Sequence, residues 1–73
     1  MTQAQAVIEL RDAADTGGNY VIDLSSDRIL GRVVGDVRLT SRGVSFRVMA
    51  QDGRRRWSRQ ISNAHVLAIR RTI

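Results

Sequence analysis

This 73-residue sequence contains no cysteine and no proline, and only one histidine, His65. Without cysteine, neither a disulfide nor a thiolate-bound metal can stabilise so small a domain. A single histidine is too little for a zinc site. No stretch approaches the ~20 apolar residues of a membrane span, and no charged-then-apolar signal peptide opens the chain. We therefore expect no metal, no cofactor and no membrane partner, and a soluble cytoplasmic protein.

Lysine is also absent, so all 12 basic residues are arginine, and the formal net charge is +5. A basic surface favours polyanionic partners such as nucleic acid. The planar guanidinium of arginine suits bidentate phosphate contacts and stacks on bases. Codon bias in a G+C-rich genome would produce the same composition, and the sequence does not separate the two causes.

The length predicts one small domain, with a helix and turn over residues 1–18 and a β-barrel over residues 19–73. A domain of this size buries only about 60% of the surface that its unfolded chain exposes. Self-association is a common remedy for so small a core. A homo-oligomer is therefore an open expectation.

A β-hairpin over residues 44–61 is the clearest local feature. Asp52-Gly53 between alternating apolar residues is a strong signal for a two-residue turn. With those two residues at the centre of the turn, Val48 lies opposite Trp57. One face then carries the predicted core residues Val44, Phe46, Val48, Trp57 and Ile61. The other face carries Ser45, Arg47, Met49, Arg54, Arg56, Ser58 and Gln60.

The N-terminal residues 1–18 predict an amphipathic helix. Thr2 and Gln5 have the spacing of a capping box, and Gly17-Gly18 provides a stop. The apolar stripe consists of Ala4, Val7, Ile8 and Ala14, widened by Leu10. Because residues 7–10 also alternate weakly, helix or strand stays open for residues 6–11.

The rest of the chain predicts short strands joined by tight turns. Strands are expected at 20–24, 28–40 and 65–71, with turns at 25–27 and 41–43 and a 3₁₀ connector at 62–64. Gly31 and Gly35 on the inward face of the long strand indicate sharp bending. The predicted fold class is mainly β, a five-stranded antiparallel barrel after an N-terminal helix, whose closure would remove exposed sheet edges.

This order of elements resembles the SH3-like and Sm-like small barrels. Val21-Ile22-Asp23-Leu24, a polar turn, and then Ile29 to Gly35 are similar to the first Sm motif, with its bent strand and glycines four apart. The segment from Ile61 to Val66 resembles the 3₁₀ connector before the last SH3-like strand. The Asn that binds RNA in Sm proteins has no counterpart in Val37-Arg38-Leu39-Thr40. The resemblance therefore implies a fold more than a function.

Catalytic motifs are not recognisable in the sequence. His65 has no nucleophile signature near it, no carboxylate pair has a telling spacing, and the segment from Gly31 to Gly35 lacks the lysine of a phosphate loop. We expect a binding module and no enzyme.

An arginine-rich surface is the candidate site, for contact with the backbone of RNA or DNA. The alternatives are a solvated hairpin tip, and a regulatory or inhibitory module that docks on an acidic protein surface. The predicted nucleic-acid-binding residues are Arg32, Arg38, Arg47, Arg54 and Arg56.

Trp57 has two interpretations. Opposite Val48 it is most simply a core residue, and truncation to Ala would then cost about 3–5 kcal/mol. As the alternative, its ring is a platform on which a base stacks, with the arginines Arg55 and Arg59 on the same face.

Overall fold

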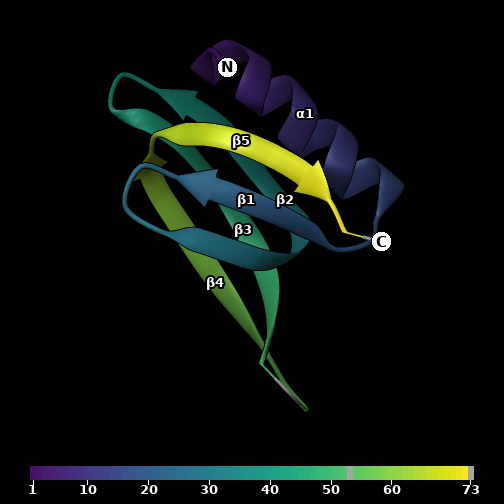
Figure 1. The fold of residues 1–73 in the computed structure, drawn as a ribbon. Helices are drawn as coiled ribbons and strands as arrows, with labels where there is room; N and C mark the ends of the chain where they lie inside the picture. Colours follow the sequence, from purple (N-terminus) through teal and green to yellow (C-terminus); the bar gives the residue numbers. More distant parts are fainter. Residues whose placement is uncertain (53, 73) are drawn as a thin grey trace.

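The computed structural model describes residues 1–52 and 54–72, without the side chains of residues 51 and 52. Its β-strands form one antiparallel sheet in the order β4-β3-β2-β1-β5, after an N-terminal helix (Figure 1). This arrangement confirms the predicted mainly β class. No helix among the described residues is long and apolar enough to cross a membrane. The elements are α1 (Gln3–Thr16), β1 (Tyr20–Leu24), β2 (Arg28–Thr40), β3 (Gly43–Asp52), β4 (Arg55–Ala64) and β5 (Val66–Arg71).

Helix α1 begins and ends where the sequence predicts, which excludes the alternative of a strand at residues 6–11. The Thr2 side chain accepts a hydrogen bond from the Gln5 amide at 3.1 Å, and Gly17 ends the helix at φ 78°. The predicted apolar stripe was partly wrong, because Ala4 and Ile8 are exposed. The face that packs against the sheet is rotated from the predicted one and consists of Ala6, Val7, Leu10 and Ala13.

Two polar side chains tie α1 to the sheet. The Gln3 amide pairs with both backbone groups of Val66, donating to its carbonyl at 2.9 Å and accepting from its N–H at 2.8 Å. Further along the helix, Arg11 donates to the Val37 carbonyl of β2. These contacts join the helix to backbone groups of β5 and β2.

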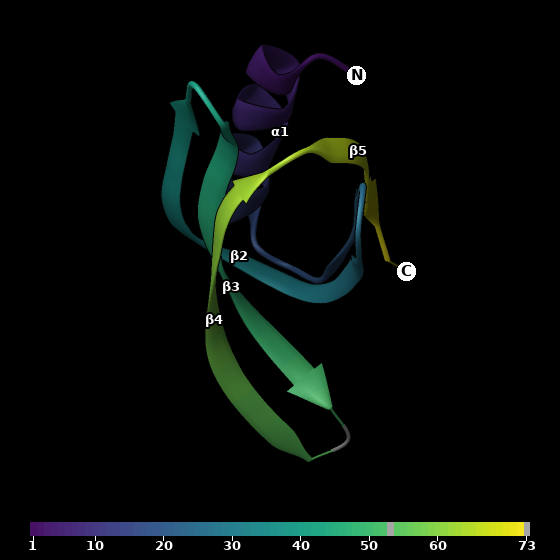
Figure 2. The ribbon, with the colours of Figure 1, turned by 90° about the vertical axis from the view of Figure 1, so that its left-hand side faces the viewer.

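Strand β2 bends sharply, as its glycines predict. The pairing with β3 shifts register twice, between Val33 and Gly35 and between Gly35 and Arg38. Asp36 has a positive φ of 57° at this irregularity. Extra residues on one strand increase its local twist and curl the sheet, so that β1, β2 and β5 wrap round the core beneath α1 (Figure 2).

The connection from β4 to β5 differs from the predicted 3₁₀ turn. Residues 62–64 continue β4, and Asn63 adopts a φ of 54° where the pairing with β3 shifts register. The buried Ser45 hydroxyl accepts the Asn63 N–H at 3.1 Å, so a bulge replaces the expected helical turn. The strand order also leaves β4 and β5 as sheet edges in the described chain, so the expected loss of both edges by closure is not observed.

The register of the β3–β4 hairpin corrects the prediction for Trp57. The predicted turn residue Gly53 lies outside the described residues, but Asp52 pairs with Arg55, so Asp52 belongs to β3. This pairing slides β4 by two positions, and Trp57 lies opposite Ala50 instead of Val48. A slip of two keeps each side chain on its predicted face. It moves Trp57 along the hairpin toward the turn, beyond the core, where the side chain is 43% exposed.

The other predicted hairpin core residues are buried, and they form the core with residues of α1, β1, β2 and β5. Phe46 is the largest side chain that is fully buried. Leu39 is the exception in β2: alternation puts it on the same predicted inward face as Gly31 and Gly35, but it is 52% exposed. The buried core members from the strands are Tyr20, Ile22, Leu24, Ile29, Val33, Val37, Val44, Phe46, Val48, Ile61 and Val66.

Candidate anion-binding face

The outer face of β2, β3 and β4 carries three of the predicted arginines, and two of them, Arg32 and Arg56, line the same hollow. Arg32 pairs in register with Met49, which pairs with Ser58. Since side chains two residues apart on a strand share a face, Arg47 on β3 and Arg56 on β4 lie on this face too. They flank the Met49–Ser58 pair on opposite sides, because Arg47 pairs with Gln60 and Arg56 pairs with Gln51. Arg32 and Arg56 are both exposed, so their guanidinium groups are accessible to an anion.

Arg32 and Arg56 line a hollow of about 300 Å³. Its other lining residues are Met49 and the pair Gly18-Asn19, which links α1 to β1. The Arg71 guanidinium lies beside Gly18, within 3.6 Å of the position that a Cβ at Gly18 would occupy. No carboxylate lines this hollow among the described residues, so the local charge is positive. We call this site the arginine hollow.

Ion pairs distinguish these arginines from others on the surface. The pairs between described residues engage Arg28, Arg47, Arg59 and Arg70, and none engages Arg32 or Arg71. A guanidinium that is paired with a carboxylate must break that ion pair to bind phosphate. Arg32 and Arg71 form no ion pair with a described carboxylate, so phosphate binding does not have to break one.

The remaining predicted site residues either lie away from the arginine hollow or already contact other side chains. Arg47 reaches Asp36 at 3.4 Å and the Ser58 hydroxyl at 3.2 Å. Arg38 pairs with Ser45, near the turn between β2 and β3. Six residues of strand, roughly 20 Å of chain, separate it from Arg32. Arg54 is exposed in the β3–β4 turn, at the far end of the hairpin. Their roles in binding stay predictions.

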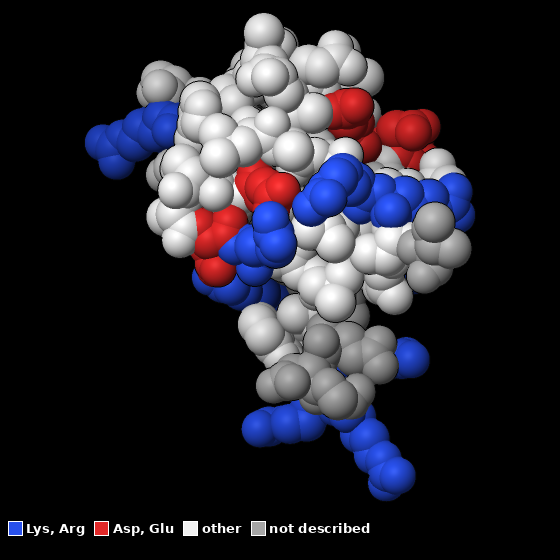
Figure 3. Space-filling model, viewed as in Figure 1, with Lys and Arg blue, Asp and Glu red and all other residues white. Residues whose placement is uncertain are grey.

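The charged side chains of the described residues are arranged differently on the body and at the hairpin end. In Figure 3, arginine side chains project from the end of the hairpin, whereas carboxylates and arginines adjoin one another on the body. The sequence already placed Arg32 and Arg56 on outward faces. The sequence carried no signal that Gly18-Asn19 and Arg71 would lie at this site, because Arg71 comes close to Gly18 only when β1 pairs with β5.

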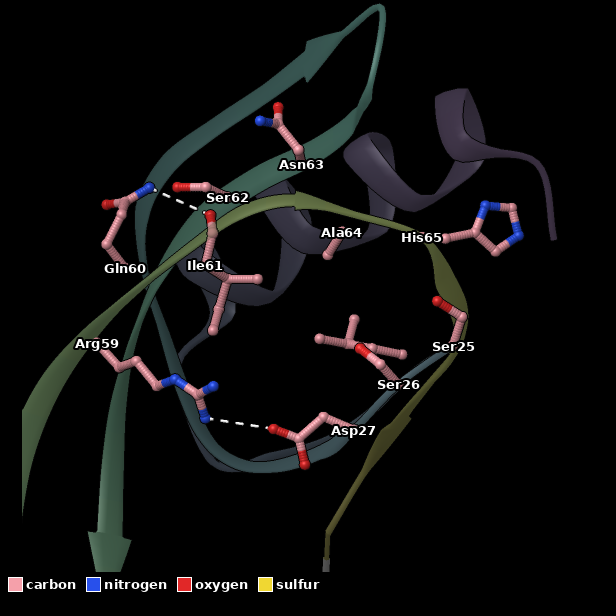
Figure 4. A pocket seen from close by; sticks show the side chains of 11 residues that line it. Ser25, Ser26, Asp27, Arg59, Gln60, Ile61, Ser62, Asn63, Ala64 and His65 are labelled. Atoms are coloured by element: carbon pink, nitrogen blue, oxygen red, sulfur yellow. Dashed lines mark hydrogen bonds and ion pairs between the residues drawn. The ribbon is translucent and has the colours of Figure 1, made fainter.

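Another hollow, of about 420 Å³, lies between the β1–β2 turn and the second half of β4 (Figure 4). Arg59 and Asp27 meet across it at 3.4 Å, and His65 points away from that ion pair. The Ser25 N–H donates to the His65 carbonyl at 3.0 Å.

Comparison with protein-family models, with curated proteins and with solved structures found no match to this chain.

Proposed function

We propose that this protein is a non-enzymatic nucleic-acid-binding module that holds the sugar–phosphate backbone at the arginine hollow. The observation that carries the proposal is the convergence of Arg32 and Arg56, from β2 and β4, on a hollow with no carboxylate among its described lining residues. Arg71 adds a third guanidinium beside Gly18. Arginines at such a site hold phosphate oxygens through charge-assisted hydrogen bonds.

The fold supports this proposal in a general way. We propose that the curled five-stranded sheet with its N-terminal helix is a variant of the SH3-like and Sm-like small barrels, and the order of its elements and the bent β2 support this proposal. Folds of this kind serve many functions, so the argument for function rests on the arginines.

The double variant Arg32→Gln/Arg56→Gln is expected to weaken binding of a single-stranded oligonucleotide and to flatten its salt dependence. Each phosphate contact contributes about 0.7 to the slope of log K against log salt concentration for a single strand, so the slope should fall by about 1.4. Both residues are exposed, so the fold should be retained. Fluorescence anisotropy of a labelled oligonucleotide, titrated at several salt concentrations, measures the slope.

The matched control is Arg42→Gln/Arg70→Gln, which removes the same charge at two exposed arginines that lie outside the arginine hollow. This control should change the slope much less than the first pair. Equal changes would show that net charge, and not the arginine hollow, governs binding. If neither RNA nor DNA binds even at low salt, the proposal is wrong, and docking on an acidic protein surface becomes the better interpretation.

A further inference from the structure

Trp57 lies at the boundary between the buried core and the projecting end of the β3–β4 hairpin. It is 43% exposed, although it lies on the inward face of β4 opposite the buried Ala50. Its partner Ala50 is the last residue of β3 that pairs with β2, and past this point the hairpin extends beyond the curl formed by β1, β2 and β5 (Figure 2). The inward face therefore loses its covering layer at this point, and a large aromatic ring is left accessible to a ligand.

A third hollow, of about 280 Å³, opens beside this ring. Its apolar lining comes from Trp57, Ala50, Ile29 and Leu30, and Leu30 is itself 52% exposed. The volume is just below the 300–1,000 Å³ of ordinary small-molecule sites. Such a space suits a single flat ring system better than a folded peptide segment. We call it the tryptophan hollow.

The polar rim of the tryptophan hollow combines donors with an acceptor. Arg28 and Arg59 contribute guanidinium groups. Asp27 contributes a carboxylate that pairs with the Arg59 guanidinium at 3.4 Å and accepts a hydrogen bond from the backbone N–H of Arg28 at 2.7 Å. Arg28 is also paired with Asp23. A carboxylate on the rim repels phosphate. The edge of a nucleobase has both hydrogen-bond donors and acceptors, so it can pair with the guanidinium groups and the carboxylate of this rim.

The arginine hollow and the tryptophan hollow lie on opposite faces of the same edge strand, β4. Arg56 and Trp57 are consecutive in β4, so their side chains point to opposite faces of the sheet. Because β4 is an edge of the described sheet, both faces can be reached from the same side. Arg55 is exposed, and alternation places it on the face of Trp57.

We propose that the tryptophan hollow receives one unpaired base of a single-stranded nucleic acid, stacked on Trp57, while arginines of β4 hold the adjoining phosphates. This inference rests on the proposed function and narrows it to single strands, because a base inside a duplex cannot reach the ring. Stacking on an aromatic side chain tolerates any base, since every base has a π-face.

Trp57 is the only tryptophan in the chain, so its fluorescence reports on this hollow alone. The experiment titrates the intact protein with a labelled single strand of about ten nucleotides, within the usual site size of small binding folds. It records anisotropy of the label for binding and tryptophan emission for stacking. The same strand as a duplex, and inorganic polyphosphate as a polyanion without bases, are the comparison ligands.

The single strand is expected to quench Trp57 in step with binding, and polyphosphate to bind without comparable quenching. Trp57→Ala should lower single-strand affinity about tenfold, as expected for one lost base stack. The salt slope and the affinity for polyphosphate should stay unchanged, because no phosphate contact is removed. Trp57→Phe should retain most of the affinity. Leu67→Ala, which truncates a side chain that is 50% exposed on β5, is the matched control and should bind normally.

The experiment distinguishes failure of the base site from failure of the proposed backbone binding. If the single strand binds with a slope that depends on Arg32 and Arg56, but Trp57→Ala binds equally well, the base site is wrong and backbone binding stands. Equal quenching by polyphosphate, or equal affinity for the duplex, would also overturn the base site. If no nucleic acid binds at low salt, both proposals fail. Circular dichroism of the Trp57 variants confirms that each is folded.

Discussion

Phe46→Ala is expected to lower the free energy of unfolding by about 3–5 kcal/mol, the usual cost of removing a buried aromatic ring. Phe46 is 0% exposed and is the largest fully buried side chain of the described chain. A domain of this length has a total stability of roughly 4–11 kcal/mol. The variant should therefore be largely unfolded at modest urea concentrations. Urea titration followed by far-UV circular dichroism measures the loss.

Trp57→Ala is the informative comparison, because the sequence alone ranks both aromatic residues as core. With 43% of its surface exposed, Trp57 should contribute about 1 kcal/mol or less to stability. If Trp57→Ala costs as much as Phe46→Ala, the ring is buried and the tryptophan hollow does not exist. Phe46→Leu, which keeps most of the apolar volume, should cost less than half as much as Phe46→Ala.

The contrast between these two aromatic residues shows what the sequence predicts well and what it does not. Alternation along a strand determines the face of each side chain, and it correctly placed Phe46 inward and Arg56 outward. The position along the hairpin depends on which residues close the turn. A shift of two residues in that closure leaves alternation intact, yet it moves Trp57 out of the covered part of the sheet.

The candidate site was predictable to a similar extent. Outward faces were readable for Arg32 and Arg56, because both lie in regular strand. The ion pair of Arg47 with Asp36 was not, because Asp36 enters a left-handed conformation at a bulge of β2. The approach of Arg71 to Gly18 joins residues far apart in the chain and arises only when β5 pairs with β1. Such contacts belong to the tertiary fold, so a local pattern contains no signal for them.

Gly31→Ala is the second substitution with a large expected effect, about 3 kcal/mol of lost stability, at the upper end of the range for overpacking. A Cβ at Gly31 would lie 2.5 Å from the Met49 carbonyl oxygen and 3.2 Å from the Ala50 Cα. The obstructing atoms are backbone atoms that β3 holds in the ladder with β2, so rotation of a side chain cannot relieve the clash. Urea titration of the variant beside the parent chain measures the effect.

The two glycines of β2 serve different physical needs, and a set of variants separates them. Gly35 has a φ of 152° and nothing within 4 Å of the position of its Cβ, so Gly35→Ala should cost only the conformational strain, about 1–2 kcal/mol. Truncating Met49 to Ala should not rescue Gly31→Ala, because the clash is with the backbone. Rescue by that truncation would mean that the Met49 side chain, rather than the approach of β2 to β3, requires glycine at position 31. Glycine at position 31 would then be needed for local packing against Met49. It would not be needed for the curl of the sheet, and it is this curl that positions Arg32 in the lining of the arginine hollow.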